Sequence, residues 1–172
     1  FTGLYMNVFD PKPEMICIED IAHALSQQPR FGGHLPRLYS VAQHSVNCSF
    51  LADSFEDKLT ALLHDASEAY ICDIPRPIKS GLTYYKEIEH KLMDVLSACF
   101  GFEYPFSESI KKIDEQMLNC EWHYLMLKNE SWKFNIYDES ESEKKFLDMF
   151  HYYNREIKKM NMLRKIRTEH YL

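Results

Sequence analysis

The chain has 172 residues, of which 45% are hydrophobic and only five are glycine, as is typical of a single packed globular domain. Its formal net charge of −6 argues against a nucleic-acid-binding surface, which would have to be basic. The five cysteines include no Cys-x-x-Cys pair, so a reducing compartment fits better than a thiolate zinc module. No apolar run approaches the ~18 residues that cross a bilayer, and we predict a cytoplasmic protein that binds neither nucleic acid nor membrane.

The first fifty or so residues are predicted to form an irregular arm and two helices. Residues 1–17 contain turn-forming glycine and proline, and a short helix over 20–27 stops at Pro29, because proline disfavours a helical residue before it. Two glycines and a proline keep residues 30–36 out of a helix. A second helix is predicted over 39–52. Its inner stripe consists of Val41, Ser45, Cys48 and Ala52.

The middle of the chain is predicted to form three more helices. Ser54, with Asp57 three residues later, is a capping-box pattern that opens one continuous helix ending before Pro75. A helix over 84–100 is followed by Gly101, a common C-terminal signal, and a third helix starts after Ser107. The inner positions of the three helices are Leu59, Leu62, Leu63 and Ala66, then Ile88, Leu92, Val95, Leu96 and Cys99, then Ile110, Ile113, Met117 and Leu118.

A last long helix is predicted to begin at the pattern Ser140-x-x-Glu143. Its apolar stripe from Phe146 to Met160 would either close the domain's own core or pack between subunits. Residues 129–138 alternate enough, through Trp132, Phe134, Ile136 and Tyr137, to allow a short extended segment.

Six predicted helices and almost no alternating pattern indicate an all-α fold without internal repeats. We expect one domain over 1–172, with its core over 18–128 and a helical extension over 139–168. Basic residues gather after Lys158, and we interpret this run as a solvated helix end.

Four potential metal ligands stand out on the predicted helices: His44, the adjacent pair His64 and Asp65, and Asp114. A helix bundle can bring such side chains together in its core. Two imidazoles and two carboxylates suit one divalent ion of Mn²⁺, Fe²⁺, Co²⁺, Ni²⁺ or Zn²⁺ better than an all-oxygen Ca²⁺ site, and would leave open positions on an octahedral ion. Glu115 is a rival ligand, but it points ~100° away from the face that Asp114 borders.

The residues that follow the His-Asp pair are rich in chemically active types. Glu68 stands four residues after His64, which predicts that both project from one helix face. Asp73 comes next, and the Pro-x-Pro turn after it carries Arg76 and Lys79. Arg76 could bind phosphate, and a surface role explains it at least as well.

The chain resembles the HD-domain phosphohydrolases, whose pattern of His, His-Asp and a distant Asp matches the four candidate ligands. The resemblance covers residues 18 to 125 and is strongest to bacterial 5′-deoxynucleotidases and to small bacterial and phage HD proteins, including deoxyadenosine triphosphate triphosphohydrolases. The motifs that carry it are Asp20-Ile-Ala-His-Ala-Leu-Ser26, Arg30-Phe-Gly-Gly-His34, Ala42-Gln-His44-Ser, Leu63-His-Asp-Ala-Ser-Glu68 and Asp73-Ile-Pro-x-Pro-x-Lys79. It implies an HD-domain helical bundle with one metal ion, because members with two metals carry more histidines in the interval where this chain has only His90.

The resemblance also implies a role for each matching residue. Glu68 would orient or activate the attacking water, and Asp73 would protonate the leaving oxygen. Three basic residues would grip phosphate oxygens, and Phe31 would lie against the sugar and help exclude a 2′-hydroxyl. The three basic residues are Arg30, Lys79 and Lys111.

We therefore expect a metal-dependent phosphohydrolase in which a metal-activated water attacks the phosphorus of a 2′-deoxynucleoside 5′-phosphate. A triphosphohydrolase that releases triphosphate is the alternative within the class. An inactive nucleotide- or metal-binding regulatory module and a cyclic-nucleotide phosphodiesterase are two further alternatives. Similar families form homo-oligomers, and a dimer or larger assembly is expected. Aromatic residues Tyr84, Tyr85 and Trp122 are interpreted as core, with stacking on a base as the alternative.

Overall fold

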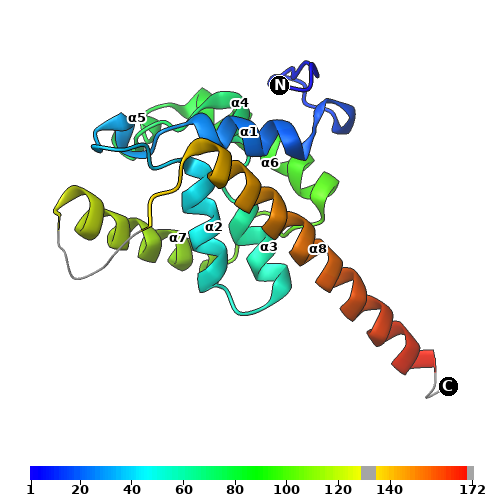
Figure 1. The fold of residues 1–172 in the computed structure, drawn as a ribbon. Coiled ribbons are helices and arrows are strands. Elements are labelled where there is room, and N and C mark those ends of the chain that lie inside the picture. The colour runs from blue at the N-terminus through cyan, green and yellow to red at the C-terminus, as the bar shows by residue number, and fades with distance from the viewer. Residues whose placement is uncertain (129–134, 170–172) are drawn as a thin grey trace.

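A computed structural model describes residues 1–128 and 135–169, and these residues form the predicted all-α fold (Figure 1). The helices are α1 (Ile18–Gln27), α2 (Val41–Leu51), α3 (Phe55–Leu63), α4 (Glu68–Ile71), α5 (Arg76–Lys79), α6 (Thr83–Phe100), α7 (Glu108–Glu121) and α8 (Glu139–Glu169). Short turns of other helix types cover Pro13–Met15, Arg30–Gly33 and Trp122–Met126. Among the described helices, none has both the length and the apolar character needed to cross a membrane.

The hydrophobic core lies where α8 packs across α1, α2 and α3 (Figure 1). The apolar stripe of α8 buries Phe146, Phe150 and Tyr153 there. Burying a large apolar side chain contributes roughly 2–3 kcal/mol relative to leaving it in water. The stripe therefore closes the domain's own core in this structure.

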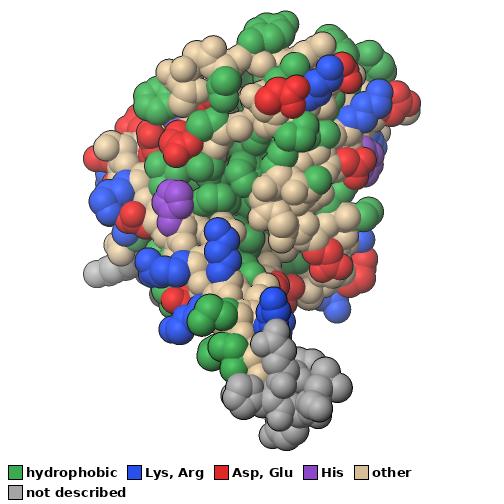
Figure 2. Space-filling view, turned by 90° about the vertical axis from the view of Figure 1, so that its right-hand side faces the viewer, with side chains coloured by type: hydrophobic (Ala, Val, Ile, Leu, Met, Phe, Trp, Pro, Cys, Tyr) green, Lys and Arg blue, Asp and Glu red, His purple; other side chains and the backbone are tan. Residues whose placement is uncertain are grey.

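The C-terminal end of α8 extends beyond the body of the molecule (Figure 1). Lys158, Lys159, Arg164 and Lys165 are all exposed there. Figure 2 shows Lys and Arg side chains gathered on the projecting end, beside hydrophobic ones. The interpretation of the basic run as a solvated helix end is confirmed for these residues.

The predicted N-terminal cap of the third helix is confirmed, whereas that of the last helix is wrong. The hydroxyl of Ser54 accepts a hydrogen bond from the backbone N–H of Asp57 at 3.0 Å, as a capping residue does. At the start of α8 the backbone N–H of Glu141 donates to Oδ1 of Asp138 at 2.7 Å. Asp138 therefore caps α8 in place of Ser140, because its carboxylate already fills the acceptor position.

Helix α6 ends as predicted but presents a slightly different face. Gly101 adopts a left-handed conformation (φ 72°), which an L side chain resists, and its N–H bonds to the carbonyl oxygen of Ser97. Cys99, predicted to be inside, is exposed, while Met93 is buried. The buried face of α6 is therefore the one that carries Leu92, Met93 and Leu96, which all contact the core.

The prediction of one continuous helix up to Pro75 is wrong. Helix α3 ends at Leu63, and α4 begins only at Glu68. Nδ1 of His64 donates to the carbonyl oxygen of Ala61 at 2.7 Å, and a continuing helix would use that carbonyl for its own i→i+4 bond. His64 and Glu68 therefore do not share one helix face, and the turn between them sets their relative position.

The segment predicted to allow an extended strand is described only from residue 135, and residues 129–134 lie outside the described part of the chain. From residue 135 onward, the backbone of this segment pairs with a side chain of α2. Nε2 of Gln43 donates to the carbonyl oxygen of Asn135 at 2.5 Å, and the N–H of Tyr137 donates to Oε1 of Gln43 at 3.1 Å. Gln43 thus anchors the start of the connection to α8 on helix α2.

Candidate metal centre and adjoining cavities

The four predicted ligands converge where α2, the end of α3, and α7 meet. The Nε2 atoms of His44 and His64 are 3.3 Å apart. Oδ2 of Asp65 lies 3.3 Å from Nε2 of His64 and 3.6 Å from Nε2 of His44. Oδ1 of Asp114 lies 3.3 Å from Nε2 of His44 and 3.7 Å from Nε2 of His64. The rival candidate Glu115 is exposed and has no contact with this cluster among the described interactions.

Hydrogen bonds on the far side of each imidazole fix which nitrogen faces the cluster. Nδ1 of His64 must donate to the carbonyl oxygen of Ala61, since a carbonyl can only accept. Nδ1 of His44 lies 2.6 Å from Oε1 of Glu121 and donates to that carboxylate. Two Nε2 lone pairs therefore face each other across 3.3 Å. Such an arrangement requires a proton or a metal ion between them.

The spacing of the four donors fits a small divalent ion. The two histidine nitrogens lie 3.3 to 3.7 Å from each other and from the two carboxylate oxygens, a spacing that suits atoms sharing one small ion at about 2.1 Å. Burial opposes a charged imidazole, but the carboxylates of Asp65 and Asp114 outweigh it and raise the pKa of His64 to about 9. The cluster is therefore built to attract a cation.

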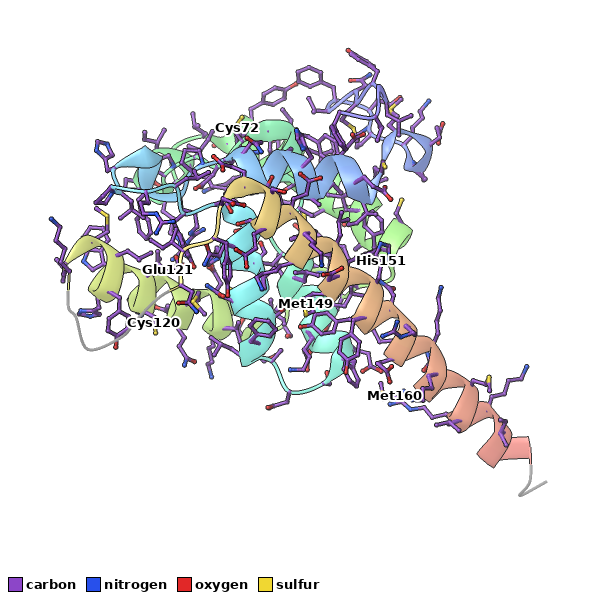
Figure 3. The ribbon with its side chains drawn as sticks, viewed as in Figure 1. Cys72, Cys120, Glu121, Met149, His151 and Met160 are labelled. Atoms are coloured by element: carbon purple, nitrogen blue, oxygen red, sulfur yellow. The ribbon has the colours of Figure 1, made fainter. Side chains whose placement is uncertain are left out.

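A buried carboxylate that the sequence analysis overlooked orients His44. Glu121, labelled in Figure 3, lies at the end of α7. It is fully buried and accepts hydrogen bonds from Nδ1 of His44, from the hydroxyl of Tyr39 at 2.8 Å and from Nε of Arg30 at 3.0 Å. Burial favours the neutral acid, but the charges and hydrogen bonds of these neighbours lower the pKa of Glu121. An ionised Glu121 therefore fixes the tautomer and the ring plane of His44.

The buried thiol of Cys48 lies next to the same histidines, and His44, Cys48 and His64 form a group that could hold a metal ion. Sγ of Cys48 is 3.5 Å from Nε2 of His44 and 3.9 Å from Nδ1. An atom straight ahead of Nε2 would be much farther from Nδ1. The sulfur therefore lies beside the imidazole ring, and Asp65 and Asp114 are better placed to complete the donor set.

The two predicted catalytic carboxylates lie on the segment just after the His-Asp pair. Glu68 is buried, and its Oε2 has no hydrogen-bond partner among the described residues. Burial, together with the nearby charges of Asp65 and Asp73, raises the pKa of Glu68, while Lys79, 3.5 Å away, opposes the rise. Burial also raises the pKa of Asp73. Nζ of Lys79 lies 2.5 Å from Oε1 of Glu89, a partner that the sequence did not indicate.

Arg30 and Phe31 lie on a tight reversal before α2. Phe31 and Gly32 both have left-handed backbones (φ 55° and 59°), and a side chain adopts that conformation at a cost of about 1 kcal/mol or more. The reversal turns Arg30 inward, where Nη1 lies 3.7 Å from Oδ2 of Asp65. It also sets the Phe31 ring against Trp122, with centroids 6.2 Å apart.

Two cavities adjoin the ligand cluster. The smaller, of about 450 Å³, is lined by Arg30, Phe31, Glu68, Asp73 and Trp122 among others. The larger, of about 640 Å³, is lined by His90, Met93, Tyr104, Phe106 and Lys111 among others. Four residues line both cavities: Asp65, Arg76, Lys79 and Asp114. Every predicted catalytic and substrate-binding residue therefore faces one of the two cavities.

Three side chains at the cavity mouths add detail to the predictions. Nη2 of Arg76 lies 2.7 Å from Oδ2 of Asp114, so Arg76 holds the ligand oxygen that faces away from the histidines. Lys111 is paired with Glu108 at 2.6 Å and is exposed. The interpretation of Trp122 as a core residue is wrong, because its ring is exposed beside the smaller cavity. It is wrong for Tyr84 as well, which is 65% exposed and lines neither cavity.

Comparison with known proteins gives a family but no activity. No family model matches the sequence. Over 121 residues the chain is 42% identical to the uncharacterized protein YfdR of Escherichia coli, covering 70% of this chain and 67% of YfdR. The chain belongs to the YfdR family. It is also 32% identical, over 120 residues, to an uncharacterized protein of Rhodobacter capsulatus, covering 64% of this chain and 61% of that protein. The chain thus spans about two thirds of the length of these relatives.

For this member of the YfdR family, a sequence signal for Glu121 did exist. Glu121 follows Asp114 by seven residues, which is two helical turns, and so lies on the same face of α7. Met117 lies between them on that buried face. No comparable signal pointed to Tyr39, since its partner is distant in sequence and reaches it only through the packing of α7 against α2.

Proposed function

We propose that this YfdR-family chain is a metal-dependent phosphohydrolase of the HD type that hydrolyses nucleotides, with 2′-deoxynucleoside 5′-monophosphates as its preferred substrates. One observation carries the proposal. The Nε2 atoms of His44 and His64, 3.3 Å apart, are flanked by Asp65 and Asp114 at the junction of two cavities, with a buried Glu68 beside them. The resemblance of the sequence motifs to HD phosphohydrolases supports the choice of a phosphate ester.

Four residues would hold the ion: His44, His64, Asp65 and Asp114. The ion would supply an acidified water and polarise the phosphoryl oxygens. The mixed nitrogen and carboxylate donors suit Mn²⁺, Fe²⁺, Co²⁺, Ni²⁺ or Zn²⁺. Glu121 supports the same assignment, because histidine ligands usually donate their second N–H to a carboxylate or carbonyl.

Glu68 would take the proton from the attacking water, and it must be ionised to do so. Burial, Asp65 and Asp73 raise the pKa of Glu68, whereas Lys79 and Arg30 favour its ionised form, as a cation held at the ligand cluster also would. Asp73 has a raised pKa, which suits a group that must hold a proton for the leaving oxygen. Arg30 and Lys79 line the smaller cavity with these two carboxylates and would neutralise charge on the phosphoryl oxygens.

A deoxynucleoside triphosphate triphosphohydrolase is the second candidate. The larger cavity supports it, because Lys111, Arg76 and Lys79 line a space of about 640 Å³ that Arg30 and Phe31 do not line. A chain of further phosphates attached to the reacting one could occupy this space.

The test begins with chelator-treated protein to which single divalent metals are restored. Ribo- and deoxynucleoside mono- and triphosphates are then assayed, and the products are separated by ion exchange. Asp114→Ala should lose the metal and lower the rate at least about 100-fold, whereas its exposed neighbour Glu115→Ala should keep the metal. Glu68→Ala should retain the metal and lose turnover.

The products decide between the two candidates. Inorganic phosphate from deoxynucleoside monophosphates supports the favoured function, and intact triphosphate from a deoxynucleoside triphosphate supports the second. Stoichiometric metal binding without turnover of any nucleotide, with every metal, would overturn both and leave a binding module.

A further inference from the structure

The segment from Glu68 to Asp73 carries both expected catalytic carboxylates, yet little regular structure supports it. Helix α4 is a single turn. Directly after it, Cys72 adopts φ 65° and ψ 154°, a conformation that residues with a side chain rarely adopt and that costs of order 1–3 kcal/mol. Such a conformation persists only where surrounding contacts hold it. The segment must therefore be fixed by groups from elsewhere in the chain.

One side chain binds both ends of this segment. Nε2 of Gln28, the residue directly after α1, donates to the carbonyl oxygen of Glu68 at 3.0 Å. Oε1 of the same amide accepts a hydrogen bond from the backbone N–H of Asp73 at 3.1 Å. A primary amide suits this arrangement, because its NH₂ group donates while its carbonyl oxygen accepts in the same plane. A third bond holds the strained residue itself, since the hydroxyl of Tyr85 donates to the carbonyl oxygen of Cys72 at 2.8 Å.

Backbone hydrogen bonds at Gln28 and Arg30 also connect the end of α1 to the start of α2. The N–H of Val41 donates to the carbonyl oxygen of Gln28 at 3.0 Å, and the N–H of Arg30 donates to the carbonyl oxygen of Tyr39 at 2.9 Å. These two bonds align the turn that carries Arg30 with the helix that carries His44. Gln28 therefore lies at the point where the carboxylate segment, the Arg30 turn and the ligand-bearing helix meet.

We propose that Gln28 is a positioning residue that holds Glu68 and Asp73 in place relative to the predicted metal ligands. Gln28 lines neither cavity, so it acts through the backbone of the two carboxylate residues and not on the substrate. The role of the carboxylates rests on the proposed function, but the two hydrogen bonds do not. The assignment can therefore be tested both in the presence and in the absence of turnover.

The test compares Gln28→Met, which keeps the length of the side chain and removes both hydrogen bonds, with Gln27→Met. Gln27 is the neighbouring, exposed glutamine, which makes it a matched control. Gln28→Met should lower kcat about 10- to 100-fold with KM within about twofold of the wild type, because small misplacements of reacting groups cost rate more than binding. Gln27→Met should leave both constants unchanged, and both variants should bind metal with wild-type stoichiometry.

Amide hydrogen exchange gives a second readout that does not need activity. The Asp73 amide should exchange at least about tenfold faster in Gln28→Met than in Gln27→Met, while the amides inside α2 and α3 keep their protection. Tyr85→Phe, which removes only the bond to Cys72, should give a smaller loss of kcat in the same direction.

An unchanged Asp73 exchange rate in Gln28→Met would overturn the positioning role, with or without catalysis. So would a loss of kcat accompanied by an equal loss of metal binding and of protection throughout the fold, which would mean general destabilisation. If the wild type turns over no nucleotide while the exchange result holds, the proposed function fails and the positioning of the segment stands.

Discussion

At the floor of the site, His44 and Glu121 are fully buried, whereas at its rim Arg76 and Lys111 leave 61% and 58% of their side-chain surface exposed. Both regions consist of charged pairs with short contacts. The floor pair has lost its water, and its hydrogen bonds must be satisfied inside the protein. The rim pairs keep their water and are held only weakly.

This difference separates two tasks. Exposed ion pairs contribute about 0–1 kcal/mol each, so Lys111 can exchange its exposed partner Glu108 for a phosphate at little cost. The floor cannot exchange partners without leaving a buried charge unpaired. We therefore expect changes at the floor to affect metal affinity and folding, and a change at Lys111 to affect substrate binding alone.

The largest effect is expected from Glu121→Gln. A glutamine can still accept from Nδ1 of His44, but it removes the charge that faces Arg30 and leaves an N–H₂ group near buried donors. We predict a 10- to 100-fold weaker metal affinity, by the usual effect of altering a partner of a ligand. The free energy of unfolding should fall by about 3 kcal/mol, as when one partner of a buried pair is removed. Metal titration and urea denaturation measure the two quantities.

The control for this variant is Glu115→Gln, an exposed carboxylate on the same helix. It should change neither metal affinity nor stability beyond about 0.5 kcal/mol. Equal effects of the two variants would mean that burial does not distinguish the floor from the rest of the site.

The same contrast explains which parts were predictable from sequence. Helices with a clear apolar stripe, such as α6 and α8, were predicted within a few residues because packing of that stripe decides their position. The break after α3 was not predicted, because it depends on the side chain of His64 bonding to Ala61, and helix propensity carries no sign of that bond. Local patterns thus predict elements, whereas side-chain bonds to the backbone decide where they stop.

The candidate site was predicted unevenly for a similar reason. His44 and Asp114 could be chosen from residue type and resemblance, since metal chemistry restricts the choice. Glu121 and Gln28 act on other protein groups, through contacts between segments 77 and 40 residues apart in the chain. The seven-residue spacing from Asp114 indicated the helix face of Glu121 but not its partner, and no sequence pattern pointed to Gln28.

A smaller effect is expected at the rim, from Lys111→Ala. Loss of one charge-assisted contact to phosphate should raise KM about tenfold and leave kcat nearly unchanged. Metal affinity and the urea midpoint should stay at wild-type values, because Lys111 is exposed and pairs only with Glu108 among the described residues. Steady-state kinetics with the best nucleotide checks this. Lys112→Ala, its exposed neighbour that lines neither of the two cavities, is the matched control.

The smallest effect concerns pH, and it distinguishes a proton from a metal ion at the floor. In metal-free protein the pKa of His64 is raised from 6.5 to about 9, mainly by Asp65 and Asp114 acting against burial. A raised pKa in the folded state stabilises the fold fully below the unfolded value of about 6.5, and this contribution is lost as the pH rises through about 9. The urea midpoint measured with chelator should therefore decrease as the pH rises from about 6.5 to about 9.

With saturating metal present, the downward slope over the same window should largely disappear. A metal ion binds the neutral imidazole, so binding displaces the proton from Nε2 of His64 and becomes tighter as the pH rises. The stabilisation that binding adds grows by about as much as the protonated imidazole loses, so with saturating metal the urea midpoint should stay nearly constant from pH 6.5 to 9. His34→Asn, which changes an exposed histidine outside both cavities, should preserve this difference between the two pH profiles. Parallel slopes with and without metal would mean that the cation never replaces the proton between the two imidazoles, and the comparison of floor and rim would then describe a structural ion cluster instead of a metal centre.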